Sequence, residues 1–155
     1  QDRAGRGRMV ALLKQETAMT ETITRMNPET LPDASRAGYS QISIVEPGRL
    51  AFVSGQVAWR RDGGAVPASA AEQLDIVIEN LSAALVALNA TTHDIAQMRI
   101  YAVDLNPEGM QAGMAAIGKF LNGAQPSLTG IGVQALAAPG LLIEVEMVVR
   151  VPEMR

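Results

Sequence analysis

The segment that follows Ser69 carries the strongest constraint on the fold. Its large apolar residues recur at spacings of four, three, four and three, at Leu74, Ile78, Leu81, Leu85 and Leu88. This spacing places a single apolar stripe along an α-helix. Ser69 and Glu72 stand before the stripe at the separation of a capping box, which predicts where the helix begins. We therefore expect an amphipathic helix with one face packed on a core.

A second helix is predicted after Asn106. Asn106 is a good N-cap, Pro107 suits the first helical position, and Glu108 places an acidic group in the first turn. Asn122-Gly123 is a helix stop signal. The apolar stripe of this helix consists of Met110, Met114, Ile117 and Leu121. We interpret its methionines as flexible core packing.

Five segments alternate in the manner of β-strands: 39–46, 50–56, 98–105, 127–134 and 141–150. Pro47-Gly48 separates the first two and predicts that they form a hairpin. Gly55, near the end of the second segment, indicates a β-bulge or a close backbone approach.

The predicted order is β-β-α-β-α-β-β, an α+β fold in one domain over residues 23–155. Two helices cannot cover both faces of a five-stranded mixed sheet, so both should pack on one face. The other face would expose a mixture of apolar and charged side chains, which favours an oligomer contact. Residues 1–22 are rich in Gly and Arg near their start, and we interpret them as a disordered arm or an addition to the natural chain.

Composition excludes several classes of function. The chain has no cysteine and one histidine, so disulfides, thiolate metal sites and a cysteine nucleophile are impossible. Residues from 26 onward carry a net charge of −5, and only five aromatic residues are present, which argues against nucleic acid as a partner. No apolar run approaches the ~18 residues of a membrane span, so we expect a soluble, cytoplasmic protein with no membrane partner.

Few side chains could carry chemistry. His93 lies between Thr92 and Asp94, and we interpret this group as a capped turn rather than part of a Ser-His-Asp site. Glu144 and Glu146 share one face of a strand, but no third ligand follows at a recognisable spacing, so we expect no metal. If an interface covers Glu144, desolvation would prepare it for proton transfer.

An ordered set of short motifs gives a more specific indication. The set comprises Gly38-Tyr39-Ser40-Gln41, Phe52-Val53-Ser54-Gly55-Gln56, Gly64-Ala65-Val66-Pro67, Glu79-Asn80-Leu81, Asp104-Leu105, Pro126-Ser127 and Leu142-Ile143-Glu144-Val145-Glu146. In this order and spacing, the motifs resemble those of the Rid/YjgF family over nearly the whole body of the chain. Each motif alone is weak, whereas the ordered set is fairly specific.

The resemblance implies a chorismate-mutase-like fold assembled as a homotrimer, with a small-molecule cleft at each subunit interface. It implies hydrolysis of reactive enamines and imines, such as 2-aminoacrylate, to a carbonyl compound and ammonia without a cofactor. In such members a tyrosine matching Tyr39 lines the cleft and a glutamate matching Glu144 holds the attacking water. Backbone groups matching Gly130 contact the substrate or the water.

One departure from the family pattern concerns the substrate. In the deaminases of the family, the fourth strand begins with proline, a small residue and an arginine that binds the substrate carboxylate. In this sequence the position of that arginine is occupied by Leu128. We therefore expect an altered substrate choice, toward a less acidic or more apolar imine. Arg99 is a candidate replacement for the lost charge, although an arginine on a strand face more often forms an ion pair. Two alternatives remain: a trimer that binds a small ligand or a partner without catalysis, and, less favoured, an endoribonuclease.

Overall fold

The computed structural model describes residues 21–154. A four-stranded sheet forms its centre, in the order β3 (Leu50–Gln56), β6 (Ile143–Arg150), β4 (Ile95–Val103) and β5 (Ser127–Val133). β3 and β4 each pair with β6 in antiparallel fashion, whereas β4 and β5 run parallel. The predicted α+β fold with a mixed sheet is confirmed. The predicted arm lies almost wholly outside the described residues.

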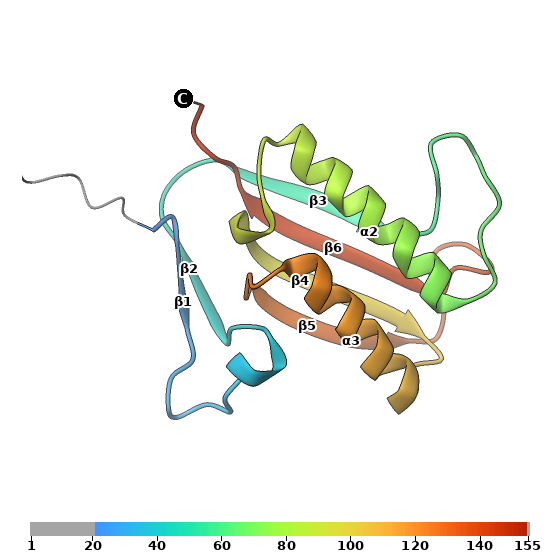
Figure 1. Ribbon diagram of the computed structural model, residues 1–155, viewed down its shortest axis with the longest axis horizontal. Coiled ribbons are helices and arrows are strands. Elements are labelled where there is room, and N and C mark those ends of the chain that lie inside the picture. Colours follow the sequence, from blue (N-terminus) through green and yellow to red (C-terminus); the bar gives the residue numbers. More distant parts are fainter. Residues whose placement is uncertain (1–20, 155) are drawn as a thin grey trace, which may run out of the picture.

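Both long helices, α2 (Ala70–Ala87) and α3 (Pro107–Leu121), cover the same face of this sheet (Figure 1). The predicted caps are present: the Ser69 side chain accepts a hydrogen bond from the Glu72 amide, and Asn106 accepts one from the Gly109 amide. Asn122 ends α3 in the left-handed conformation at φ 47°. The local signals therefore predicted the starts of both helices and the end of α3 correctly.

The core lies between the helices and the sheet. Its sheet side is supplied mainly by alternate residues of β6: Ile143, Val145, Met147 and Val149, all buried. The helices contribute Leu74, Val77, Leu81 and Ile117, which are also buried. Because successive strand residues point to opposite faces, the intervening residues of β6 face away from the helices.

The predicted hairpin of the first two strands is wrong. β2 (Ile42–Val45) pairs instead with β1 (Ile23–Met26), in a separate two-stranded sheet set at one end of the molecule (Figure 1). The five-stranded sheet expected from sequence is consequently four-stranded. The Arg150 guanidinium donates to the carbonyls of Glu46 and Pro47 and lies against Gly48. The Pro47-Gly48 segment therefore wraps around a distant side chain instead of joining two paired strands.

Two short 3₁₀ helices, Ser35–Ala37 and Thr92–Asp94, complete the described elements. Arg25 in β1 donates to the carbonyls of His93 and Ile95, which holds the small sheet against the start of β4. Within residues 21–154, no helix combines the length and apolar character that crossing a membrane requires.

Candidate functional site

The sheet face opposite the helices carries Glu144. Its carboxylate lies directly over Gly55 of β3, where a Cβ atom would collide with its Oε1. The register between β3 and β6 shifts between Val53 and Gln56, so Gly55 lies within a β-bulge. The sequence prediction of a bulge or a close approach at Gly55 is confirmed in both respects. The glycine leaves this space to the Glu144 carboxylate, which a side chain at position 55 would displace.

Glu146, two residues further along β6, is held by two donors. Its Oε1 accepts hydrogen bonds from the Tyr101 hydroxyl at 2.8 Å and from Arg99 Nη1 at 3.1 Å. Arg99 therefore has the ion-pair role that its position on a strand face suggests. Glu144 differs, because no side chain among residues 21–154 donates a hydrogen bond to its carboxylate.

The hydrogen bonds among Arg99, Tyr101 and Glu146 shift the pKa values of all three side chains. The Tyr101 hydrogen bond, followed by that from Arg99, lowers the pKa of Glu146 below its usual value. The same hydrogen bond to Glu146 raises the pKa of Tyr101, and the contact with Glu146 also raises the pKa of Arg99. Glu146 is thus kept ionised, and Tyr101 is kept as a neutral hydrogen-bond donor.

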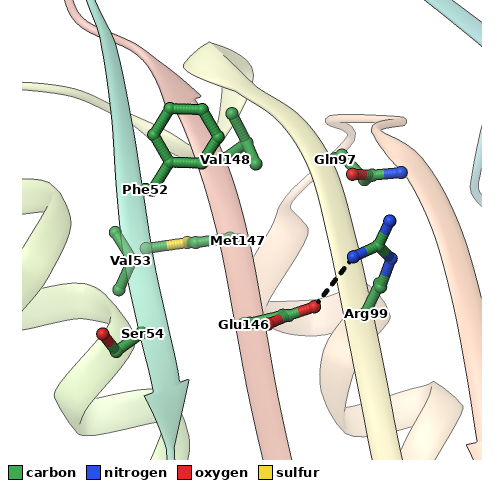
Figure 2. Close-up of a pocket in the computed structure, with 8 residues that line it drawn as sticks. All are labelled: Phe52, Val53, Ser54, Gln97, Arg99, Glu146, Met147 and Val148. Atoms are coloured by element: carbon green, nitrogen blue, oxygen red, sulfur yellow. Dashed lines mark hydrogen bonds and ion pairs between the residues drawn. The ribbon is translucent and has the colours of Figure 1, made fainter.

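A shallow hollow of about 320 Å³ lies on the open face, and Arg99 and Glu146 are among the residues that line it (Figure 2). Polar residues from β4, Gln97 and Arg99, line one side, and Phe52 with Val148 forms an apolar wall on the other. The Phe52 side chain is 77% exposed. An exposed aromatic side chain beside valine is typical of a protein–protein interface.

The other predicted site residues lie around β5, which is one of the two edge strands of the sheet. Ser40 forms a parallel bridge with Ser127, which places Tyr39 beside the start of β5. Leu128 packs against the core on the helix side, because it pairs with buried Met98. Gly130 follows on the same side of β5, is exposed, and has open space around its Cα.

Within one chain, the structure therefore separates the predicted residues into two groups. Glu144 lies on the open face beside Gly55, whereas Leu128 and Gly130 lie on the helix side of an edge strand. A single subunit does not bring these groups together around one small molecule. The position of Leu128 under the helix layer was not evident from sequence, because alternation along a strand does not say which face is buried.

The turn that contains His93 has a structural role. Thr91 and Asp94 form a capping box around the 3₁₀ helix, with the Thr91 amide donating to Asp94 Oδ2 at 2.8 Å. The interpretation of these polar residues as caps is confirmed. Among residues 21–154, no three His, Asp or Glu side chains gather closely enough to hold a metal ion.

Tyr101 is the residue of this site that sequence reasoning missed. Its hydroxyl crosses to Glu146, although the Cα partner of Tyr101 in the antiparallel register is Glu144. The sequence signal for this contact was limited to the alternation of β4, which places Tyr101 and Arg99 on the same face of the strand. The diagonal contact depends on the pairing of β4 with β6, which no local pattern reports.

Together these features define an α+β protein in which both long helices cover one face of a mixed sheet and Glu144 lies on the other face. The chain belongs to the Rid/YjgF family: residues 30–151 match the family model described as Endoribonuclease L-PSP. It is 32% identical over 113 residues to the RutC family protein YjgH of Escherichia coli (strain K12), covering 72% of this chain and 82% of that protein.

Solved structures of the family are also similar. The Rid-family protein YyfB from Yersinia pestis superposes with a TM-score of 0.78 at 37% identity, covering 83% of this chain and 98% of that one. Rv2704 from Mycobacterium tuberculosis, a member of the YjgF/YER057c/UK114 family, gives a TM-score of 0.56 at 25% identity, with coverage of 83% and 99%. These similarities extend over almost the full length of both structures.

Proposed function

We propose that this protein hydrolyses a reactive imine or enamine to a carbonyl compound and ammonia, without a cofactor, in clefts between the subunits of a homotrimer. The observation that carries the proposal is the carboxylate of Glu144, which lies over Gly55 and accepts no side-chain hydrogen bond from residues 21–154. Such a carboxylate is free to accept a hydrogen bond from a water molecule. Membership of the Rid/YjgF family supports the same reaction class.

In the proposed reaction, Glu144 orients one water molecule toward the carbon of a protonated C=N group. The water oxygen bonds to that carbon while one of its protons passes to Glu144. In the resulting carbinolamine, Glu144 returns this proton to the amino nitrogen and the C–N bond breaks with ammonia as the leaving group. The hydroxyl proton passes to Glu144 as the C=O bond forms. Little further assistance is needed, because the iminium carbon is already electrophilic and the site has only to position the water.

The division of the site supports its location between subunits. Glu144 and Gly55 would come from one subunit, and Tyr39, Leu128 and Gly130 from the edge strand of a neighbour. Exposed Phe52 and Leu50 on the open face would be covered by the same contact. Closing the cleft would also exclude bulk water, which strengthens the interaction of Glu144 with its ligand.

The chemistry of Leu128 indicates the substrate class. A leucine cannot donate to a carboxylate, and Arg99 is already paired with Glu146 on the open face. The proposed substrate is therefore an imine with an apolar or weakly acidic substituent. Amine oxidases acting on apolar primary amines generate such imines in situ, and amino-acid oxidases generate carboxylate-bearing imines for comparison.

The test is the rate at which the carbonyl product appears from these imines, with and without the protein. We expect acceleration for the apolar imines and a loss of about 100-fold or more in Glu144→Ala, the magnitude typical of a general base. Acceleration of no imine, together with ligand binding that survives in Glu144→Ala, would instead support a non-catalytic binding trimer. RNA cleavage by wild-type protein that disappears in Glu144→Ala would favour the endoribonuclease activity named in the family description, although the net charge of −3 disfavours RNA binding.

A further inference from the structure

The two carboxylates of β6 on the open face lean in opposite directions. Glu144 reaches toward β3 and lies over Gly55, whereas Glu146 reaches toward β4 and accepts from Tyr101 and Arg99. The Cα register pairs Arg99 with Glu146 and Tyr101 with Glu144. The Tyr101 hydroxyl therefore passes over its direct cross-strand partner to reach the diagonal one.

We propose that Glu146 is a positioning residue that holds Tyr101 and Arg99 away from Glu144 and so leaves the Glu144 carboxylate free for the attacking water. This inference rests on the proposed function. It assigns the Arg99–Tyr101–Glu146 group a role in the reaction that does not require any of the three to touch the substrate.

The register makes Glu144 an alternative acceptor, because it is the direct cross-strand partner of Tyr101. Residues two apart on a strand are separated by about 7 Å, and long or aromatic side chains span diagonal neighbours at this distance. Without Glu146, the Tyr101 hydroxyl and the Arg99 guanidinium would therefore come within reach of Glu144. Each captured donor would occupy a lone pair that the water needs and would make the carboxylate a weaker proton acceptor.

In the part of the chain that the structure describes, no other charged side chain competes for these donors on this region of the face. β3 contributes only residues without titratable side chains (Leu50–Gln56). Further along β6, Arg150 is bound to the carbonyls of Glu46, Pro47 and Val151. β4 supplies Arg99 and Tyr101 themselves. The pair of Arg99 and Glu146 is also well exposed, with side chains 46% and 35% accessible, respectively, so its contribution to stability is small.

The first test follows Tyr101 and does not depend on activity. The chain has two tyrosines, so Tyr39→Phe leaves Tyr101 as the only source of tyrosinate absorbance during an alkaline titration. We expect Tyr101 to keep a raised pKa in Glu146→Ala, because its hydroxyl transfers to Glu144. The raised pKa should disappear only when Glu144→Gln is added. A return of the Tyr101 pKa to its ordinary range in Glu146→Ala alone would overturn the proposal.

The second test measures imine hydrolysis. Glu146→Ala should lower kcat/KM by at least about tenfold, because Glu144 becomes engaged. Adding Arg99→Met and Tyr101→Phe should restore the rate to within about threefold of wild type, since the interfering donors are gone. Glu146→Gln keeps an acceptor for both donors and should remain closer to wild type than Glu146→Ala.

Glu79→Ala is the matched control, because it breaks another exposed Arg–Glu pair, that of Arg60 and Glu79, away from the site. Its rate should be unchanged. A rate in Glu146→Ala that equals wild type, or one that the two further substitutions fail to restore, contradicts the positioning role. If wild-type protein hydrolyses no imine, the proposed function fails, and the tyrosine titration still decides whether Glu146 keeps Tyr101 from Glu144.

Discussion

At the scale of single residues, the face to which a side chain points decides its possible role. Leu128 was expected to border the substrate, and it lies on the helix side of edge strand β5. Glu144 lies on the opposite face of the same sheet. Both positions can belong to one cleft only if neighbouring chains contribute different groups.

Leu128→Arg tests the importance of charge at this position. The long apolar stem of arginine can follow the path of leucine while its guanidinium reaches the sheet edge. A charge-assisted hydrogen bond contributes about 1.5–3 kcal/mol, so kcat/KM for 2-aminoacrylate should rise by roughly 10–150-fold. The coupled assay for keto acid measures this change, and Leu128→Met is the neutral control. If arginine has no more effect than methionine, the charge at this position does not limit the reaction.

Gly55→Ala tests the placement of Glu144. The added methyl group would occupy the space of the Glu144 carboxylate and force it to move. We expect a fall in kcat/KM of at least about tenfold with little change in fold, because misplacing a reacting group by about 1 Å is costly. Gly118→Ala serves as the control, since Gly118 lies in α3, away from the proposed cleft, and open space surrounds it. Equal rates in the two variants would show that Glu144 does not need its position over Gly55.

At the scale of elements, the sequence predicted what local chemistry determines. Ser69 and Asn106 cap helices that begin as expected, and Gly55 lies in the expected bulge. Pairing partners that depend on distant residues were not predictable. The short β1 carries little periodic signal, and the turn after β2 is shaped by Arg150, a residue about one hundred positions later.

The pairing of β4 with β6 should make stability depend on pH through Glu146. Folding lowers the pKa of this carboxyl, so its ionised form stabilises the fold above the unfolded pKa, and the contribution is lost as pH falls through the folded pKa. The difference in free energy of unfolding between wild type and Glu146→Gln should therefore be larger at neutral pH than in acid. Urea unfolding at both pH values measures it. A constant difference would mean that the contacts of Glu146 do not persist in solution.

At the scale of the whole molecule, helices cover one face of the sheet and leave the other open (Figure 1). That open face combines exposed Phe52 and Leu50 with the polar group around Glu146. An apolar surface of this kind is costly to leave in water and favours association with further copies of the chain.

Phe52→Glu should weaken that association. Burying a carboxylate without a partner in an apolar contact is strongly unfavourable, so the variant should dissociate at concentrations at which wild type remains trimeric. Sedimentation equilibrium gives the mass of each. Val86→Glu is a suitable control, because Val86 is 79% exposed and belongs to α2 on the helix side. A wild-type protein that sediments as a single subunit would contradict the proposed assembly.

The central claim is that one cleft combines Glu144 of one subunit with the β5 edge of another. The most direct measurement is imine hydrolysis by trimers assembled from a mixture of Glu144→Ala and Gly130→Trp chains. Each variant alone should be inactive, whereas random mixing leaves about a quarter of the clefts with both native halves and should restore a comparable fraction of wild-type activity. Mixed trimers that stay as inactive as their parents would contradict a site shared between subunits.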